Sequence, residues 1–569
     1  MSYTLKTKKT GPFLKFYVRG EQMSKISTMD SFSRNAVENF LQTVVFVDDK
    51  IYAPPPTGTV IEEKKGSAPK TRKAATKSAE KIKSGISVAA LEESEEENPF
   101  SPHDIQASFA KKRIVCSLHQ PPKSHSVGVE SDTYKLCSCA DIVIVDWDLY
   151  GDAGVKAKTL VENLVIQSLK EDPHQLRLVL IYTDATDLFD ISNQIFERLT
   201  EKISDEIEYK DADKGLAFHT LNARVVVLGK PIKRLDEFKP FEVTEAELAD
   251  RAISEFCKLA DGMLQGGILM GLAAIRKQSR KILTKFHSGL DAAFLTHRAL
   301  SLPDEEAFDH ITPLLVAEIE AVLGDSLKSP LLPNSILKDW CDNREFGICT
   351  QTKINGVDIH DFAYNFCCSG ENVLKTPGLQ SIPSKKQLQY VLCIDDTTQN
   401  PPLPDVSLMS ELAVLMSQRT QYGSQRKFLK LGTMLRECSG QERYLLCLQP
   451  VCDSVRLSGS KPFLFCYMDK PDKKVTHIVP DGKKYCELSF NPCKENRAII
   501  VFSANHKKMV AEKKNADTKH LFSDEEKNEY RWVAQLKPDH AQQAAEQFAR
   551  EISRVGLTES EWLHRGAKR

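Results

Sequence analysis

The fold of this chain is decided by the stretch Asp141-Ile142-Val143-Ile144-Val145-Asp146-Trp147-Asp148-Leu149. Its four consecutive aliphatic residues predict a strand that is buried on both faces, as in a parallel sheet covered by helices. Asp146 stands where this strand ends. Because open α/β sheets bind ligands at the carboxyl ends of their strands, we regard the Asp146 carboxylate as a candidate for chemistry rather than for packing.

Three other segments share this design, in which an apolar run leads into polar residues. Residues 44–47 precede Asp48 and Asp49, residues 178–182 precede Thr183 and Asp184, and residues 225–229 precede Lys230 and Pro231. Parallel strands end at the same edge of their sheet, so the sequence predicts that these polar groups meet there. An apolar run that ends in Asp is common in α/β proteins, and only the full set in this order is specific.

Taken in chain order, the acidic pair, Asp146, Thr183 and the Lys230-Pro231 pair resemble a response-regulator receiver domain, the phosphoacceptor module of two-component signalling. The resemblance implies an α/β fold with a doubly wound, five-stranded parallel sheet of flavodoxin-like strand order 2-1-3-4-5. The alternative is an ordinary doubly wound domain in which these polar residues only cap the strands.

The resemblance also implies a magnesium site. Phosphoryl transfer to a carboxylate needs a divalent cation to neutralise the equatorial oxygens, and Mg²⁺ accepts a few carboxylates while it keeps several waters. Asp49 would bind Mg²⁺ directly, and Asp48 would help through water. The phosphoacceptor Asp146 and the backbone carbonyl of Asp148 would be the further protein ligands.

Two more residues take their expected roles from the resemblance. Lys230 would pair with Asp146 and then with the phosphoryl group, and Thr183 would bond a phosphoryl oxygen when its loop switches. These roles follow from the chemistry of an acyl phosphate, which needs fixed donors for its oxygens.

Four positions depart from the usual receiver pattern. The residue after the switch threonine is normally small but is Asp184 here, and Asp148 adds a second carboxylate close to the acceptor. Tyr150 replaces the proline usually found four residues after the acceptor, and Val227 replaces the aromatic residue expected three before the lysine. Both carboxylates would repel a phosphoryl oxygen unless a cation screens them. We therefore expect phosphorylation chemistry without the familiar aromatic read-out.

The chain of 569 residues predicts roughly two to four domains. We assign residues 1–30 to an N-terminal arm, 31–262 to the receiver domain, 263–345 to a helical connector and 346–569 to a C-terminal α+β domain. Residues 53–101 combine prolines, a lysine-rich run and a glutamate-rich run, and predict a disordered insertion. Without it, the separation between Asp49 and Asp146 is close to that in ordinary receivers. Residues 204–220 predict a second, smaller insertion.

Composition narrows the class of partner. Lys plus Arg (77) nearly balances Asp plus Glu (78), so no global basic field suggests nucleic acid as an obligatory partner. The 15 cysteines form no C-x-x-C pair and no leader pattern opens the chain, which favours reduced thiols and a cytoplasmic location. The most apolar stretch, residues 263–275, is too short for a membrane span and predicts a buried helix.

The C-terminal region offers weaker candidates. Gln449, Asp453 and Arg456 are open to two interpretations, a binding site or a turn stabilised by Asp453. The pairs Cys137 with Cys139 and Cys367 with Cys368 lack the second pair that a closed zinc site needs. We find no Ser, His and acid arrangement and no Walker-type loop, so we do not expect an independent enzyme activity.

The function that the resemblance implies is acceptance of a phosphoryl group from a partner sensor histidine kinase, as a relay or a phosphate sink. The large insertion and the lack of a DNA-binding output are similar to the receiver proteins of bacterial defence systems, such as the stand-alone receiver of Detocs-type anti-phage systems. Another receiver-containing effector would then be a second partner. The alternative is a receiver-gated effector whose C-terminal domain binds a nucleotide, nucleic acid or protein. The sequence leaves the oligomeric state open.

Overall fold

The computed structural model of the chain describes most residues from 28 to 553 in two compact units. The described ranges are 28–52, 101–124, 126–170, 176–203, 207–209, 215–220, 222–301, 311–326, 333–343, 353–354, 357–375, 394–396, 403–404, 406–422, 426–455, 457–471, 475–482, 484–492, 495–506, 508–514 and 520–553. The first unit lies within Lys15–Leu283 and Ile319–Trp340, and the second within Thr284–Glu318 and Cys341–Arg569. Most of the predicted N-terminal arm 1–30 and nearly all of the predicted insertion 53–101 lie outside the described residues, whereas residues 28–30 of the predicted arm begin a helix.

The first unit is built on a mostly parallel sheet. Its parallel strands run in the order β2 (Val115–His119), β1 (Thr43–Val47), β3 (Ile142–Val145), β4 (Arg177–Thr183) and β7 (Ala223–Gly229). This confirms the predicted doubly wound sheet of order 2-1-3-4-5. The described residues add two antiparallel strands beyond β7, namely β6 (Ala217–His219) and β5 (Glu208–Tyr209).

The antiparallel extension falls where the sequence predicted only an insertion. Ala217 and Phe218 are buried and point to opposite faces of the sheet, one into each core cluster. A short strand that contributes to both cores closes the edge beside β7. Three residues were too few for a period-two pattern to predict this strand.

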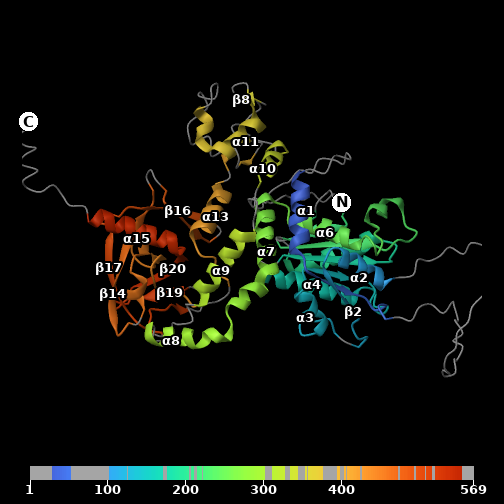
Figure 1. The fold of residues 1–569 in the computed structure, drawn as a ribbon, viewed down its shortest axis with the longest axis horizontal. Helices are drawn as coiled ribbons and strands as arrows, with labels where there is room; N and C mark the ends of the chain where they lie inside the picture. Colours follow the sequence, from blue (N-terminus) through green and yellow to red (C-terminus); the bar gives the residue numbers. More distant parts are fainter. Residues whose placement is uncertain are drawn as a thin grey trace, which may run out of the picture. The chain divides into compact units, whose positions relative to one another are not determined.

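Helices cover both faces of this sheet (Figure 1). On one face pack α1 (Thr28–Phe40), α2 (Pro102–Lys111) and α6 (Leu248–Leu259), and on the other α3 (Asp132–Ser138), α4 (Val155–Lys170) and α5 (Leu188–Ile203). Along β3, Ile142 and Ile144 enter the first core whereas Val143 and Val145 enter the second. Burial of each such side chain contributes about 1.5–3 kcal/mol. The strand that decides the fold is thus anchored on both faces.

The helix α7 (Met263–Lys285) follows α6 and is tied to the first unit. The position where Gly266 would carry a Cβ lies 2.7 Å from the Phe32 ring, so only glycine permits this approach. Arg276 donates to both carboxylate oxygens of Asp141 at 3.1 Å. The sequence predicted a buried helix at 263–275. The helix is present as part of α7, but it is buried on one side only, because Leu264, Ile268 and Leu272 are 56%, 54% and 43% exposed.

Three shorter helices complete the region predicted as a connector. They are α8 (Asp291–Ser301), α9 (Ile311–Ser326) and α10 (Asn334–Asp342). The first two were predicted and α10 was not. A separate connector role for residues 263–345 stays a prediction. None of the helices among the described residues is both long and apolar enough to cross a membrane.

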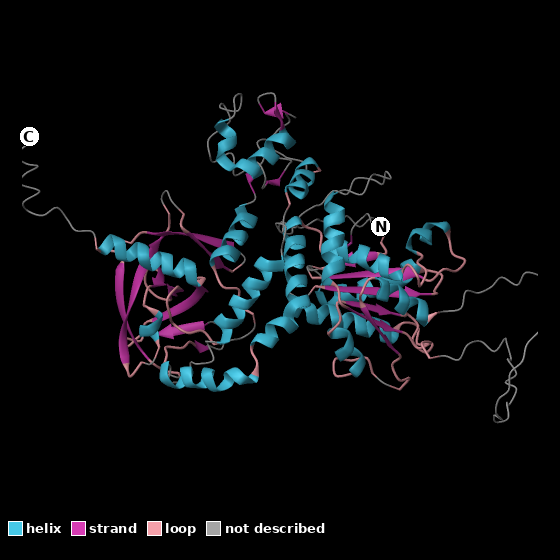
Figure 2. Cartoon of the chain, viewed as in Figure 1, coloured by secondary structure: helices cyan, strands magenta, loops and turns pink. Residues whose placement is uncertain are grey.

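The second unit contains an antiparallel sheet (Figure 2). Its strands are β12 (Thr433–Glu437), β13 (Tyr444–Cys447), β14 (Ser460–Asp469), β15 (His477–Asp481), β16 (Lys484–Phe490), β17 (Arg497–Ser503), β18 (Lys513–Lys514), β19 (His520–Ser523) and β20 (Glu529–Gln535). They follow the order β15-β16-β14-β13-β12-β20-β19-β18, with β17 paired to β14. The helix α15 (Pro538–Ile552) packs Ala541, Ala544 and Phe548 against one face.

Part of this unit had been predicted. The sequence of this region predicts strands at 389–394, 428–435, 444–448, 463–468 and 498–502. The last three overlap β13, β14 and β17, the run at 428–435 shares only residues 433–435 with β12, and the run at 389–394 lies almost entirely outside the described residues. The predicted helices near 406–419 and 541–554 correspond to α13 (Val406–Ser417) and α15. The smaller elements are β8 (Lys353–Ile354), β9 (Val357–Asp358), α11 (Ile359–Ser369), η5 (Gly370–Lys375), β10 (Ile394–Asp396), β11 (Leu403–Pro404) and α14 (Val451–Ser454).

Candidate functional site

Buried polar side chains gather where β1, β3, β4 and β7 end. Asp48, Asp146, Thr183 and Lys230 are each at most 7% exposed. Lys230 Nζ donates to Asp146 Oδ1 at 2.8 Å and to Asp48 Oδ2 at 3.3 Å. The lysine also lies over the Tyr182 ring, 5.6 Å from its centroid. One ammonium group therefore bridges two carboxylates that come from neighbouring strands.

Burial dominates the electrostatics of this cluster. Burial, with a smaller contribution from the nearby Asp48 carboxylate, raises the pKa of Asp146 to about 7 against the opposing Lys230 ammonium. Burial lowers the pKa of Lys230, but the Asp146 and Asp48 carboxylates outweigh this effect and raise it above its ordinary value. The lysine thus stays charged, while the Asp146 carboxylate needs additional positive charge nearby to be fully ionised near neutral pH.

The loop after β3 holds Asp49 in place. Tyr150, Gly151, Ala153 and Gly154 all have positive φ angles, between 53° and 82°. At Gly154 a Cβ would meet the Trp147 ring at 2.3 Å, so glycine is required there. Tyr150 N donates to Asp49 Oδ2 at 2.9 Å. A proline at position 150, as in the usual receiver pattern, could not make this bond because it has no N–H.

The two additional carboxylates differ in their surroundings. Asp148 is exposed and its Oδ1 accepts from Ala153 N at 3.0 Å, within its own loop. Asp184 Oδ2 lies 3.3 Å from Lys50 Nζ. Burial raises the pKa of Asp184, but the Lys50 and Lys230 ammonium groups hold it below its usual value, and its charge in turn raises the pKa of Asp146. Asp184 therefore acts electrostatically on Asp146.

The residues at this edge fit a magnesium ion. Asp49 Oδ1 is buried and has no hydrogen-bond partner, although its other oxygen is bound. Mg²⁺ keeps several waters and usually takes only one or two carboxylates, so Asp49 and Asp146 suffice. Within the described residues no three His, Cys, Asp or Glu side chains are close enough together to hold a metal.

Thr183 is engaged within its own loop. Its Oγ1 accepts from Ala185 N at 3.1 Å, and its backbone carbonyl accepts from Lys230 N at 2.7 Å. A hydroxyl can accept one hydrogen bond and donate another at the same time. The bond from Ala185 N therefore does not prevent the Thr183 O–H from donating to an acceptor in the site. The backbone bond joins the loop that carries Thr183 to the residue that carries the ammonium group.

Sequence reasoning missed two residues that lie at this edge. Lys50 follows the acidic pair by one residue and pairs with Asp184. Arg234 follows Lys230 by four residues, and its side chain is 0% exposed and bonded to both loops of the site. The only signal in the sequence is that each is a charged residue within four positions of a residue of the motif.

The C-terminal candidates do not form a site among the described residues. Gln449 Oε1 accepts from Leu464 N at 3.2 Å, which ties a loop to β14. Asp453 closes a short turn in which its N–H donates to Pro450 O at 3.0 Å. Arg456 lies outside the described residues. Cys137 is buried, whereas Cys139 and Cys368 are exposed.

Comparison with known families identifies the sheet domain. Residues 40–235 match the family model described as the response receiver domain. No curated protein and no solved structure matches the chain. The matched residues run from the end of α1 to the segment after Lys230, so they contain every strand of the parallel sheet and every residue of the polar edge.

Proposed function

We propose that this chain, in which residues 40–235 form a response receiver domain, takes a phosphoryl group onto Asp146 in a Mg²⁺-dependent reaction. A receiver domain indicates phosphoacceptor signalling of the two-component type. The donor would be the phosphohistidine of a partner sensor histidine kinase. The observation that carries the proposal is the Lys230 ammonium, which lies 2.8 Å from Asp146 Oδ1 in a buried cluster at the carboxyl edge of the sheet.

The transfer is an in-line displacement at phosphorus. A carboxylate oxygen of Asp146 forms the new P–O bond as the P–N bond to the donor imidazole breaks, and the imidazole leaves with the electron pair. Lys230 already faces the acceptor, so its Nζ can follow the negative charge from the carboxylate to a phosphoryl oxygen. Bound magnesium would neutralise phosphoryl oxygens during this step, with Asp49, Asp146 and the Asp148 carbonyl as ligands.

Thr183 supplies the second donor in this proposal. Thr183 is the last residue of β4, and its hydroxyl accepts a hydrogen bond from Ala185 N in the loop that leads to α5. A small rotation of the loop would bring the O–H toward a phosphoryl oxygen above Asp146. The departure at Val227, which is fully buried, means that this movement does not depend on an aromatic side chain.

We further propose that the protein works as a relay or a phosphate sink. The Asp184 charge that raises the pKa of Asp146 would also repel the phosphoryl group, which itself brings roughly two negative charges. Repulsion shortens the lifetime of an acyl phosphate, and a short lifetime suits a sink. The setting we propose is bacterial anti-phage defence, on the architectural resemblance alone, with a receiver-containing effector as the competing acceptor.

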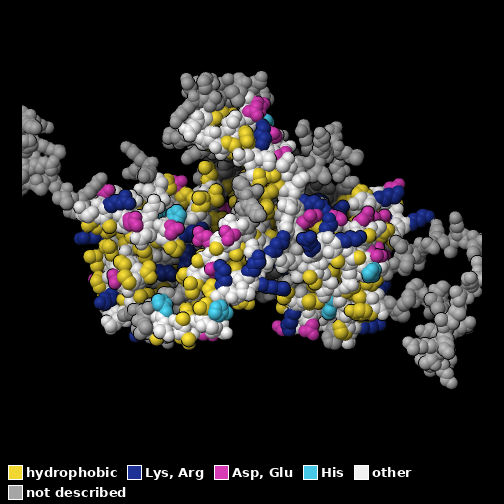
Figure 3. All heavy atoms as spheres, in the orientation of Figure 1, with side chains coloured by type: hydrophobic (Ala, Val, Ile, Leu, Met, Phe, Trp, Pro, Cys, Tyr) yellow, Lys and Arg dark blue, Asp and Glu magenta, His cyan; other side chains and the backbone are white. Residues whose placement is uncertain are grey.

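A receiver-gated effector is the second candidate. It is favoured by exposed apolar residues on β17 in the second unit, where Ile499 and Val501 are 61% and 39% exposed. Figure 3 shows apolar side chains on the surface formed by β14 and β17. If this surface carries the output, Ile499→Lys will abolish the biological response while phosphorylation of Asp146 is unchanged. A pure sink would retain its effect in that variant.

The direct test is incubation of the full-length protein with acetyl phosphate and Mg²⁺. We expect a gain of one phosphoryl group in the intact mass, lost on treatment with hydroxylamine and absent from Asp146→Asn. Asp190→Asn is the matched control because Asp190 is an exposed aspartate on α5. Failure of both acetyl phosphate and the cognate kinase to modify the wild-type protein would refute the proposal.

A further inference from the structure

The buried guanidinium of Arg234 joins the two loops that flank the acceptor. Arg234 Nε donates to Ala185 O at 2.7 Å and Nη2 donates to Thr183 O at 2.9 Å. Nη1 donates to Lys230 O and, at 3.0 Å, to Glu242 Oε1. Two of these acceptors belong to the Thr183 loop and two to the chain that follows β7. The guanidinium of Arg234 therefore contacts both loops, so a shift of either loop changes its hydrogen bonds.

Gly229 provides the space for this group. A Cβ at residue 229 would lie 2.6 Å from Arg234 Nη1 and 2.9 Å from its Cζ. Real Cβ atoms do not approach this closely, so the guanidinium rests on bare backbone immediately before Lys230. The neighbouring backbone is fixed as well, because Val243 N donates to Gly229 O at 3.0 Å and Tyr182 Oη donates to Val243 O at 2.8 Å.

The energetics of Arg234 make it a fixed element of the site. Its side chain is 0% exposed and Arg remains charged in proteins, so the charge must be compensated by bonds. The Glu242 carboxylate, whose side chain is 18% exposed, supplies the opposite charge. The three carbonyl acceptors bind three more of the five N–H groups of the guanidinium. Loss of any of these acceptors would leave the buried charge with fewer hydrogen bonds. The guanidinium must therefore move together with the loops that carry them.

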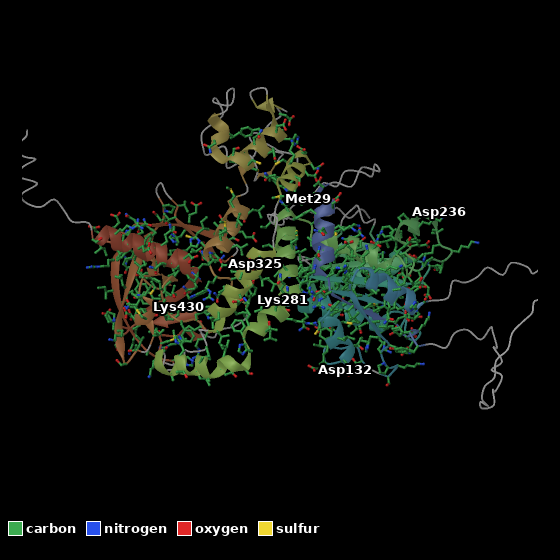
Figure 4. All side chains as sticks on the ribbon, viewed as in Figure 1. Met29, Asp132, Asp236, Lys281, Asp325 and Lys430 are labelled. Atoms are coloured by element: carbon green, nitrogen blue, oxygen red, sulfur yellow. The ribbon has the colours of Figure 1, made fainter. Side chains whose placement is uncertain are left out.

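The segment beyond Arg234 is the part that would move with it. The 3-10 helix η2 (Asp236–Phe241) follows directly, and Asp236 at its start is labelled in Figure 4. A pocket of about 530 Å³ lies between this segment and the start of α5, with Asp187, Phe189, Leu235 and Phe238 in its wall. Phe189 and Phe238 both line this pocket, and their ring centroids lie 5.0 Å apart.

We infer that Arg234 is a positioning residue that couples the Thr183 loop to Lys230 and transmits their movement to residues 235–242. When Thr183 turns toward a phosphoryl oxygen, its carbonyl and that of Ala185 move, and the guanidinium must reorient. The pocket between α5 and η2 changes shape as a result. The transmission rests on the proposed phosphorylation of Asp146, whereas the positioning of the loops does not.

The first experiment uses the unmodified full-length protein and hydrogen exchange read by mass spectrometry. In Arg234→Gln we expect exchange of residues 183–187 to rise by about tenfold or more, because the carbonyls of Thr183 and Ala185 lose the charged donor that holds them. Gly229→Ala should reproduce the effect by displacing the guanidinium, and Arg234→Lys should restore part of the protection. The β1 and β3 peptides should be unchanged.

Arg198→Gln is the matched control, since Arg198 is a partly exposed arginine of α5 whose partner is Glu162. Unchanged exchange at 183–187 in Arg234→Gln, or an equal rise in the Arg198→Gln control, would overturn the inference whether or not the protein accepts phosphoryl groups.

The second experiment compares phosphorylated proteins at equal extents of modification, with longer incubation for slower variants. In the wild type, exchange should change at 183–187 and at 235–242 together. In Arg234→Gln the second change should be lost. Persistence of the change at 235–242 in this variant, or its absence from the phosphorylated wild type, would contradict the transmission. If no adduct forms at all, the proposed function fails, and the first experiment alone decides the role of Arg234.

Discussion

The Lys50 ammonium lies 3.3 Å from the Asp184 carboxylate and joins the loop after β1 to the loop after β4. Both side chains are about half exposed, at 50% and 51%, so the pair itself adds little stability. Its importance is electrostatic, because Asp184 stands beside Thr183 and raises the pKa of the acceptor. Lys50 partly neutralises that carboxylate and so moderates its repulsion of a phosphoryl group.

We therefore expect opposite effects from the two halves of this pair. Asp184→Ala should enlarge the space for the phosphoryl group beside Asp146 and weaken Mg²⁺ binding. It should also lengthen the half-life of the phosphorylated protein by about tenfold or less, since the Asp184 charge is only half buried. Lys50→Gln should shorten the half-life because it leaves Asp184 unscreened. Decay of the adduct followed by intact mass measures both. If Asp184→Ala abolishes phosphorylation while fold and Mg²⁺ binding are unchanged, Asp184 takes part in the transfer and its interpretation as a brake is wrong.

Magnesium binding should depend on Asp49. Its buried Oδ1 has no hydrogen-bond partner, so replacement of the carboxylate by an amide removes the oxygen best placed for a cation. We expect Asp49→Asn to weaken Mg²⁺ binding by about tenfold or more in isothermal titration. Chelation by EDTA should prevent adduct formation in the wild type. Equal Mg²⁺ affinity in Asp49→Asn and in the Asp190→Asn control would show that Asp49 does not bind the ion.

The ion pair between Arg224 and Glu255 should decide the stability of the receiver domain. Both side chains are 1% exposed, and Arg224 Nε and Nη2 donate to Glu255 Oε2 at 3.0 and 2.8 Å. Removal of one partner leaves a buried charge, so Glu255→Ala should lower the free energy of unfolding by about 3–5 kcal/mol in a denaturant titration. Glu237→Ala, at an exposed position, is the control. A loss below about 1 kcal/mol would show that the pair is not isolated from solvent.

The second unit should lose stability in weak acid through His477. Burial, with the nearby His540, lowers the pKa of His477 to about 4. Between that value and about 6.5, the unfolded chain binds a proton that the folded chain does not. Stability from this group is therefore fully present above about pH 6.5 and falls by about 1.4 kcal/mol per unit as pH decreases below it.

Calorimetry of the full-length protein at pH 7 and pH 5 tests this titration. His477→Gln should reduce the pH dependence of one thermal transition, whereas His540→Gln, at an exposed position, should not remove it. An identical pH dependence in the wild type and His477→Gln would contradict the assignment.

The sheet of the receiver domain could be predicted because its strands are long apolar runs. Residues 142–145 and 178–182 are buried on both faces, and such runs have no other stable place in an α/β domain. The positions of Asp146 and Lys230 at strand ends followed from the same runs. The edge strands β5 and β6 are too short to carry a pattern, and their position depends on contacts that distant residues make.

Lys50 and Arg234 could not be predicted because loop geometry places them. The contact of Arg234 with Thr183 joins residues 51 positions apart and requires the bare backbone of Gly229. No periodicity encodes such a contact. In the second unit, β15 and β16 have few buried residues and no regular alternation, so the pairing of β16 with β14 and of β15 with β16 depends on a register that one sequence does not reveal.

The measurement that tests the central claim most directly is the location of the phosphoryl group. Borohydride reduces an aspartyl phosphate to homoserine, so peptide mapping after incubation with Mg²⁺ and either acetyl phosphate or the partner kinase identifies the acceptor. The account predicts homoserine at position 146 in the wild type and none in Asp146→Asn. Homoserine at another carboxylate, or at no position with either donor, would contradict it.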